Sequence, residues 1–300
     1  MNSVKEQWLN EIGTPTQTCT EAPLTLLAKF DEPDFDGEMY SQPNGIGTEQ
    51  RLLFLFPKNL TRPAPAVLVP FYFPEAMVGY DPATGEKLPR YEEVAMMLHL
   101  VRRGYITVSA DSYHLTYIQS DLERMNFGRW REASQALMKD HPTWTGIGKL
   151  VHDTRLMTDA LLADPRVDAN HIGIAGHSLG GKMAFYSGCL DDRIHAILAS
   201  DFGIGWDQTN WRDHWYWGDK VDTLIAKGMD HAGLLGCAAP KPFCLLAGLY
   251  DNDDSWTMMQ SAPGYSEDDG RLKIINHATG HRPPFDVLNE GYDFLDKWLK

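Results

Sequence analysis

Short apolar runs alternate with amphipathic stretches along most of the 300-residue chain. Runs typical of buried strands occupy residues 50–56, 64–70, 105–110, 172–175, 194–200, 242–247 and 272–276. Between them, residues 91–103, 149–163 and 179–189 carry apolar side chains at helical spacing, and a last helical pattern places Phe285, Leu288, Tyr292, Leu295 and Trp298 on one face. Strands that alternate with helices predict an α/β fold with a mainly parallel sheet covered by helices on both faces.

The spacing of these elements predicts one large domain with additions. Residues 1–49 are mixed and rich in Pro, Thr and Asp, and we expect them to form an N-terminal extension that wraps the domain of residues 50–300. Two long connections, near 111–148 and 201–240, are predicted to form pocket walls. The second contains Trp206, Trp211, Trp215 and Trp217. These tryptophans fit either local core or an aromatic wall for a sugar ring or apolar group, and the sequence leaves both open.

Composition excludes several classes of partner. The net charge of −14 repels a phosphate backbone, so nucleic acid is not expected to bind. None of the four cysteines forms C-x-x-C or a metal-ligand spacing, so no metal is expected. The N-terminus lacks the apolar stretch of a secretion signal and no run is long enough to cross a membrane, which favours a soluble, cytoplasmic protein without a membrane partner. The oligomeric state stays open.

The most informative motif is Gly176-His177-Ser178-Leu179-Gly180, placed directly after a predicted strand and directly before a predicted helix. A serine that attacks carbonyl groups must project from a sharp strand-to-helix turn. Glycines two positions before and after it remove side chains that would collide at such a turn. The pattern therefore predicts that Ser178 is a nucleophile. His177 lies inside the same turn and is expected to line the substrate pocket.

A nucleophilic serine requires a histidine base and a carboxylate that orients the base, in the chain order Ser, acid, His for this type of turn. His281 follows the last predicted strand and is the preferred base, with His277 as the alternative. Asp251 follows the strand of residues 242–247, shortly after Gly248, and is the preferred acid. The alternative acids are Asp201, which also ends a strand, and Asp253 and Asp254, which follow Asp251 closely.

The tetrahedral intermediate of acyl transfer needs preorganised hydrogen-bond donors for its oxyanion. We expect the backbone N–H of Leu179, at the start of the helix, to supply one. The loop after the strand of residues 64–70 should supply the other, from Phe71 or Tyr72, because Pro70 has no N–H.

These motifs resemble the α/β-hydrolase superfamily. The residues that carry the resemblance are Gly176 to Gly181, Gly248-Leu249-Tyr250-Asp251 and Gly280-His281. Asp164 to Asp168, Leu190 to Ile194 and Ala238 to Pro242 are similar to the dienelactone hydrolase and acetyl xylan esterase branches. The resemblance implies an α/β-hydrolase fold with an eight-stranded sheet, no cofactor, and ester hydrolysis through an acyl-enzyme. Dienelactone hydrolases use a cysteine nucleophile, whereas position 178 is serine.

The sequence therefore predicts a serine esterase that removes short acyl groups, such as acetyl, from a carbohydrate or similar small polar ester. An amide, peptide or thioester hydrolase would use the same machinery. A non-catalytic binding protein would not be expected to keep the whole Ser, Asp and His set. Gly176 to Lys182 also fits the G-x-x-x-x-G-K part of a phosphate-binding loop, but Met183 stands where the Mg²⁺-binding Ser or Thr is required.

Overall fold

The computed structural model describes residues 3–15, 22–45, 47–58, 60–266 and 269–300. The strands are β1 (Thr25–Asp31), β2 (Phe35–Gly45), β3 (Thr48–Pro57), β4 (Ala64–Leu68), β5 (Ile106–Ala110), β6 (Val167–His177), β7 (Ala196–Ser200), β8 (Phe243–Ala247) and β9 (Leu272–Asn276). The helices are α1 (Val4–Ile12), α2 (Met96–Arg102), α3 (Tyr113–Thr116), α4 (Phe127–Asp140), α5 (Gly146–Ala163), α6 (Leu179–Leu190), α7 (His214–Trp217), α8 (Val221–Ala226), α9 (His231–Gly236), α10 (Asp253–Gln260) and α11 (Phe285–Leu299), with 3-10 turns η1 (Pro74–Met77) and η2 (Pro89–Val94).

All strands of the described residues form a single sheet, in the order β1-β2-β3-β5-β4-β6-β7-β8-β9. The strands from β5 to β9 in this order are parallel, whereas β1, β2 and β3 are antiparallel to their neighbours. The α/β-hydrolase fold expected from the sequence is confirmed, although the sheet has nine strands in the described residues and not eight. The predicted boundary between residues 49 and 50 falls inside β3, and much of the expected wrapping extension is β1 and β2 of this same sheet.

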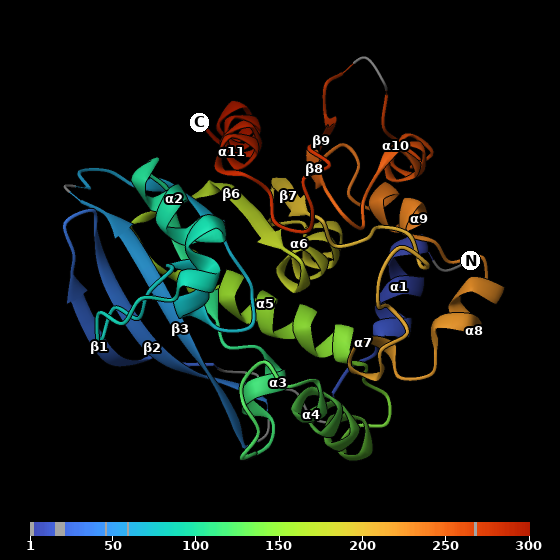
Figure 1. Cartoon of the computed structure of the whole chain (residues 1–300), viewed down its shortest axis with the longest axis horizontal. Coiled ribbons are helices and arrows are strands. Elements are labelled where there is room, and N and C mark those ends of the chain that lie inside the picture. The colour runs from blue at the N-terminus through green and yellow to red at the C-terminus, as the bar shows by residue number, and fades with distance from the viewer. Residues whose placement is uncertain (1–2, 16–21, 46, 59, 267–268) are drawn as a thin grey trace.

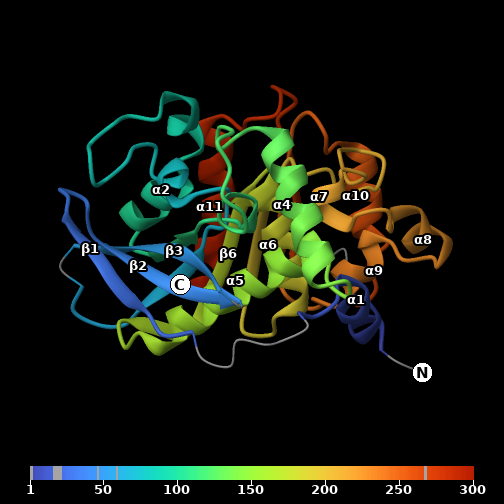
Figure 2. The ribbon, with the colours of Figure 1, turned by 90° about the horizontal axis from the view of Figure 1, so that it is seen from below.

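Helices cover both faces of the sheet. Helices α5 and α6 pack on one face against β4, β6 and neighbouring strands, and α2 and α11 pack on the other against β5, β7 and β8. Figure 1 shows the two pairs on opposite sides of β6, and Figure 2 shows α5 and α6 in front of the sheet with α11 behind it. Helix α1 packs against α9 and α5 beside the N-terminus. No helix of the described part of the chain is long and apolar enough to cross a membrane.

The helix expected over residues 91–103 is divided in two. Residues 89–94 form the 3-10 turn η2, and α2 begins only at Met96. Ala95 between them has ψ of 61°, which no helical residue adopts, so the chain changes direction there. Tyr91 of η2 packs edge-to-face against Phe71 and Phe73 in the loop after β4.

The carboxyl ends of the parallel strands lie together at one edge of the sheet. Ser178 follows β6, Asp201 follows β7, and His281 lies in the connection after β9. The register pairs His177 with Ser200 at the ends of β6 and β7. Polar side chains that are far apart in the sequence therefore meet at this edge, as is typical of open α/β sheets.

Candidate active site

The strand-to-helix turn at Ser178 is as sharp as the sequence predicts. Ser178 has φ of 57° and ψ of −116°, a backbone conformation that is strained for a residue with a side chain. A Cβ on Gly176 would lie 2.1 Å from the carbonyl oxygen of Gly180, and one on Gly180 would lie 2.2 Å from the carbonyl oxygen of Pro70. Only glycine fits at these two positions. The turn leaves the Ser178 hydroxyl facing the carboxyl edge of the sheet.

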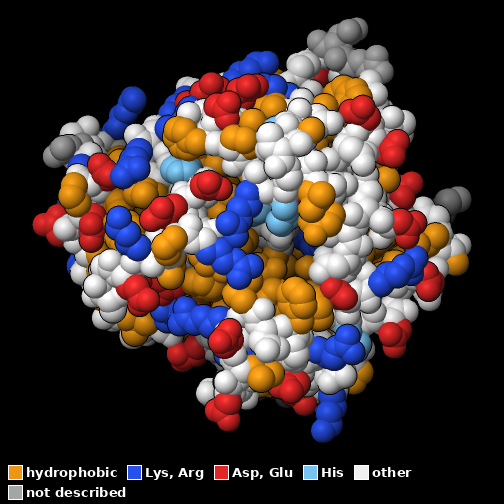
Figure 3. All heavy atoms as spheres, in the orientation of Figure 1, with side chains coloured by type: hydrophobic (Ala, Val, Ile, Leu, Met, Phe, Trp, Pro, Cys, Tyr) orange, Lys and Arg blue, Asp and Glu red, His pale blue; other side chains and the backbone are white. Residues whose placement is uncertain are grey.

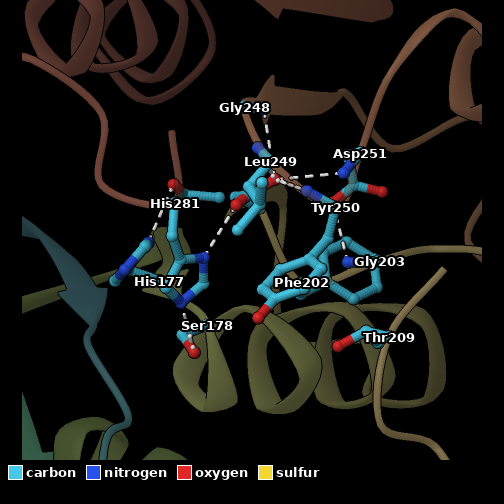
Figure 4. A network of polar contacts seen from close by, with 12 residues as sticks. His177, Ser178, Phe202, Gly203, Thr209, Gly248, Leu249, Tyr250, Asp251 and His281 are labelled. Carbon is cyan, nitrogen blue, oxygen red and sulfur yellow. Dashed lines mark hydrogen bonds and ion pairs between the residues drawn. The ribbon is translucent and has the colours of Figure 1, made fainter. Parts of the chain in front are cut away.

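His281 lies between Ser178 and Asp201. Its Nε2 is 2.9 Å from Oγ of Ser178, and its Nδ1 is 2.7 Å from Oδ2 of Asp201. Figure 4 shows the imidazole above the serine hydroxyl, with His177 beside it. These distances are those of hydrogen bonds within reach of proton transfer. The structure thus joins a serine, a histidine and a carboxylate in the geometry that activates a hydroxyl nucleophile.

Asp201 is held by a cluster of backbone donors. Its Oδ1 accepts hydrogen bonds from the N–H groups of Gly248, Leu249, Tyr250 and Asp251, at 2.8 to 3.1 Å. Figure 4 shows these N–H groups converging from the turn after β8. Burial raises the pKa of Asp201, but the bonds from His281 and these N–H groups outweigh burial and lower the pKa below its usual value. The carboxylate is therefore ionised and fixed in orientation.

The expectation that Asp251 orients His281 is corrected by this geometry. Asp251 is fully buried, and its carboxylate accepts bonds from the N–H groups of Gly203 and Ile204, at 2.8 and 2.7 Å, and from Oγ of Ser255, at 3.0 Å. Burial raises its pKa. The side chain braces the loop that follows Asp201 and does not contact His281. The rival candidate Asp201 occupies the predicted place of Asp251.

The remaining alternatives lie away from the serine. Asp253 and Asp254 are exposed residues in the first turn of α10. Asp253 accepts a bond from Asn276, at 3.3 Å. The Nδ1 of His277 lies 2.7 Å from Oγ1 of Thr279, and its ring packs against Gly248. Neither carboxylate, nor His277, contacts Ser178 or His281.

His177 is buried beside the reacting groups. Its Nδ1 lies 3.1 Å from Oγ of Ser200, and its ring centroid is 4.5 Å from that of His281. Burial, and next to it the nearby charge of His281, lowers the pKa of His177 to about 3. The His177 ring is therefore neutral at neutral pH. A neutral neighbour does not repel the positive charge that His281 acquires when it accepts a proton.

The predicted oxyanion donors lie next to Ser178. Leu179 is the first residue of α6, where backbone N–H groups have no acceptor within the helix. The loop after β4 lies close against the same turn, since the ring of Phe71 and the carbonyl of Pro70 both border Gly180. Phe71 and Tyr72 line the cavity that Ser178 faces. The backbone of both loops therefore borders the space in which an ester carbonyl would sit.

A cavity of about 450 Å³ opens above Ser178. Both long connections contribute to it, through Met125, Phe127 and Trp130 from residues 111–148 and through Thr209, Asn210, Asp213 and Tyr216 from residues 201–240. Its other walls comprise Phe71, Tyr72, Arg90, Tyr91, Val94, His177, Lys182, Asp201, Tyr250, His281 and Arg282. Figure 3 shows hydrophobic side chains and basic side chains gathered around a histidine near the centre of this face. The cavity thus combines an aromatic lining with a few polar groups, as small-molecule sites do.

The aromatic wall is not built from the tryptophans that the sequence singles out. Trp206, Trp211, Trp215 and Trp217 are all buried, and the most accessible, Trp206, is 9% exposed. None of the four lines the cavity. Trp206 packs against Trp211 and Trp217, and Trp8 of α1 packs against Trp206 and Trp217, which together form an aromatic cluster. Of the two interpretations that the sequence leaves open, local core is correct for all four, and the aromatic wall is not.

Lys182 is a buried amine in the lining of the cavity. Its Nζ donates a hydrogen bond of 2.7 Å to the carbonyl of Phe202 and lies 4.3 Å from the ring centroid of Trp211. Burial lowers its pKa to about 7, although Asp251, Asp213 and Asp201 act in the opposite direction. This placement is unlike that of a phosphate-binding lysine, because the amine is directed at a carbonyl and aromatic rings.

The depressed pKa of Lys182 makes stability depend on pH. Between pH 7 and the ordinary lysine value of 10.5, the unfolded chain binds a proton at Lys182 that the folded chain does not. The free energy of unfolding should therefore rise with pH in this window, by at most about 1.4 kcal/mol per unit, relative to Lys182→Met. Urea unfolding of both proteins at pH 7.5 and 9.5 measures this difference. A constant difference between them would contradict the assignment.

Several cavity residues lie outside the sequence prediction. Arg90, Tyr91, Phe127, Trp130, Tyr216, Tyr250 and Arg282 all line the cavity. Arg282 directly follows the predicted base, and Lys182 lies one helical turn after Ser178, so proximity to the motif could have identified both. Phe127 and Trp130 carry no such signal, because only tertiary contacts bring α4 over the sheet edge.

Comparisons with known proteins agree with this architecture. The Bacillus subtilis (strain 168) protein YtaP, which carries the name of a hydrolase, is 23% identical over 269 residues, 82% of each chain. A glucuronoyl esterase from Solibacter usitatus superimposes with a TM-score of 0.72 at 14% identity, covering 98% of this chain and 90% of its own. An acetyl xylan esterase from Paenibacillus sp. R4 superimposes with a TM-score of 0.63 at 14% identity, covering 99% and 91%.

These similarities at low identity establish the fold. The family is shown by a separate comparison, in which residues 14–212, two thirds of the chain, match the model of the Abhydrolase family. That segment contains β1 to β7, the turn at Ser178 and Asp201. With its sheet, its strand-to-helix turn and its serine, histidine and carboxylate in contact, the chain belongs to the Abhydrolase family and is a hydrolase of the α/β-hydrolase type.

Proposed function

We propose that this protein is a serine esterase that hydrolyses carboxylic esters through an acyl-enzyme at Ser178. The observation that carries the proposal is the chain of two hydrogen bonds from Ser178 through His281 to Asp201, at 2.9 and 2.7 Å. A serine hydroxyl is a weak nucleophile unless a base removes its proton during attack. Within the described residues, His281 places a ring nitrogen at hydrogen-bond distance from Oγ of Ser178 and so supplies this base.

In the first half of the reaction, Oγ of Ser178 bonds to the acyl carbon while Nε2 of His281 takes the hydroxyl proton. Asp201 stabilises the resulting imidazolium through Nδ1. The N–H of Leu179, together with that of Phe71 or Tyr72, would hold the oxyanion. The intermediate collapses as the ester C–O bond breaks and Nε2 returns the proton to the departing alcohol. Water then repeats the attack on the acyl-enzyme and releases the acid and Ser178.

The preferred substrate is a short-acyl ester, most simply an acetyl ester, of a carbohydrate or similar polar alcohol. The cavity joins aromatic side chains with the polar groups of Thr209, Asn210 and Asp213. Solved proteins with this fold include those named acetyl xylan esterase and glucuronoyl esterase. Both observations support a polar ester, whereas nothing in the cavity favours an amide or thioester over it.

Hydrolysis of a matched substrate panel tests this function. The purified protein is expected to release p-nitrophenol from the acetyl ester, with kcat/KM falling as the acyl chain lengthens from acetyl to octanoyl. It should release acetate from acetylated xylo-oligosaccharides and leave p-nitroacetanilide nearly intact. Ser178→Ala serves as the blank. Equal rates for wild type and Ser178→Ala on every ester, or a preference for the anilide, would contradict the proposal.

A further inference from the structure

A row of stacked aromatic side chains leads from the loop after β4 to the mouth of the cavity. The rings of Tyr72 and Trp130 stack with centroids 4.6 Å apart. The ring centroids of Trp130 and Phe127 are 4.9 Å apart, and Phe127 stacks on Trp215 with centroids 5.6 Å apart. Trp130 and Trp215 are buried, so they support Phe127 from within the protein. The row therefore links an oxyanion-loop residue to a surface ring through direct contacts.

Phe127 is the exposed member of this row. It lines the cavity above Ser178, yet it is 62% exposed. It is the first residue of α4, whose start is fixed by a bond of 2.8 Å from the N–H of Gly128 to Oδ1 of Asn126. A phenyl ring that is anchored on two tryptophans and left open to the cavity presents a flat, rigid apolar surface to whatever enters. Trp130 and Trp215 therefore hold the Phe127 ring in place although the ring stays exposed.

A polar cluster lines the same cavity. Asn210 donates from Nδ2 to Oδ2 of Asp213 at 2.6 Å, and Oγ1 of Thr209 donates to Oδ1 of Asn210 at 3.2 Å. These residues directly precede α7, the helix that carries Trp215 behind Phe127. One segment, residues 209–217, thus supplies both the polar groups and Trp215, which supports the Phe127 ring. A pyranose ring has an apolar C–H face and a rim of hydroxyls, which match a flat aromatic ring and amide or carboxylate groups respectively.

We propose that Phe127 is a specificity-determining residue that stacks on the pyranose ring bearing the scissile ester, while Asn210 and Asp213 bond the hydroxyls of that ring. This inference rests on the proposed esterase function and assigns the alcohol part of the substrate. The acyl group reaches Ser178, and the sugar occupies the cavity mouth. Esters of simple alcohols lack the stacked ring and should be poorer substrates.

Two esters with the same acyl group separate this role from catalysis. Acetate release is measured from a mono-O-acetylated methyl β-D-xylopyranoside and from ethyl acetate. Phe127→Ala should lower kcat/KM for the xylopyranoside by about tenfold and leave ethyl acetate within about twofold, since one aromatic contact is lost for the sugar alone. Phe127→Tyr should restore the preference. Phe285→Ala, which alters a phenylalanine that is 54% exposed but does not line the cavity, should change neither rate.

Equal losses on both esters with Phe127→Ala, or no loss on either, would overturn the stacking role while leaving the esterase function intact. A second measurement does not need turnover. Saturation transfer from the wild-type protein to unacetylated methyl β-D-xylopyranoside should be observed by NMR and should weaken in Phe127→Ala. If this transfer is present but no ester is hydrolysed, the sugar site stands and the esterase function fails. If the transfer is absent from wild type, the sugar site fails.

Discussion

Asp201→Asn is expected to lower kcat for ester hydrolysis by about 10⁴-fold, the loss found when an asparagine replaces the carboxylate of such a triad. The asparagine Oδ1 can still accept the four N–H groups of residues 248–251, so the fold should be kept. Its amide nitrogen would then face Nδ1 of His281, which must become an acceptor. The proton of the neutral imidazole would move to Nε2, which could no longer take the proton of Ser178.

Asp251→Asn is the matched control for this variant. It removes the same charge from a neighbouring, equally buried carboxylate that bonds Gly203, Ile204 and Ser255 instead of His281. We expect a loss of about 1–3 kcal/mol in the free energy of unfolding. The kcat measured well below the melting temperature should stay within about tenfold of wild type, because the imidazole keeps its partner. The reverse ranking of the two kcat values would contradict the assignment of Asp201.

His281→Ala is expected to lower kcat by about 10⁴-fold or more, comparable to removal of the nucleophile, because serine and histidine act as one unit. Stability should change little, since the side chain is 31% exposed and its main contacts are Ser178 and Asp201. Steady-state hydrolysis of p-nitrophenyl acetate, with thermal unfolding on the same samples, measures both effects.

His277→Ala provides the comparison for that loss. His277 lies four residues earlier in the same connection and contacts Thr279 and Gly248, but not Ser178. A change in kcat of no more than about fivefold is expected for a side chain that touches neither substrate nor base. If His277→Ala were the more damaging substitution, His281 could not be the base.

The elements that local sequence determines could be predicted well. The turn at Ser178 depends on Gly176 and Gly180. A side chain on Gly176 would collide with the backbone of Gly180, and a side chain on Gly180 would collide with the backbone of Pro70. The strands β4, β5, β7 and β8 are short, strongly apolar runs, and their carboxyl ends lie at the same sheet edge. By contrast, β1 is largely exposed at the sheet edge and β2 contains Gly37 and Pro43, so neither shows a clear pattern of buried residues.

The choice between Asp201 and Asp251 illustrates what sequence patterns leave undetermined. Both follow buried strands, and both are buried in the structure. What separates them is the conformation of two loops: Asp201 has a positive φ of 43°, which lets its carboxylate meet the N–H groups of the turn after β8 and His281 together. That arrangement depends on contacts between residues about fifty positions apart in the chain.

Both long connections line the cavity, but the four tryptophans do not, for the same reason. Four tryptophans in residues 201–240 indicate a large apolar surface, but not which side of it faces the substrate. The cluster with Trp8 buries Trp206 and Trp217, and the packing of α4 exposes Phe127 instead. The direction in which these tryptophans face depends on tertiary packing, since Trp8 of the N-terminal helix α1 packs against Trp206 and Trp217, about 200 residues later in the chain.

An acyl-enzyme at Ser178 is the intermediate on which the proposed reaction depends, and it can be detected by mass spectrometry. The protein is mixed with excess p-nitrophenyl acetate, quenched in acid during turnover, digested and examined by mass spectrometry. We expect one acetyl group on the peptide that contains Ser178 in the wild-type protein, and none on that peptide in Ser178→Ala. Undiminished turnover by Ser178→Ala, or acetyl bound covalently at another residue whose replacement stops the reaction, would contradict it.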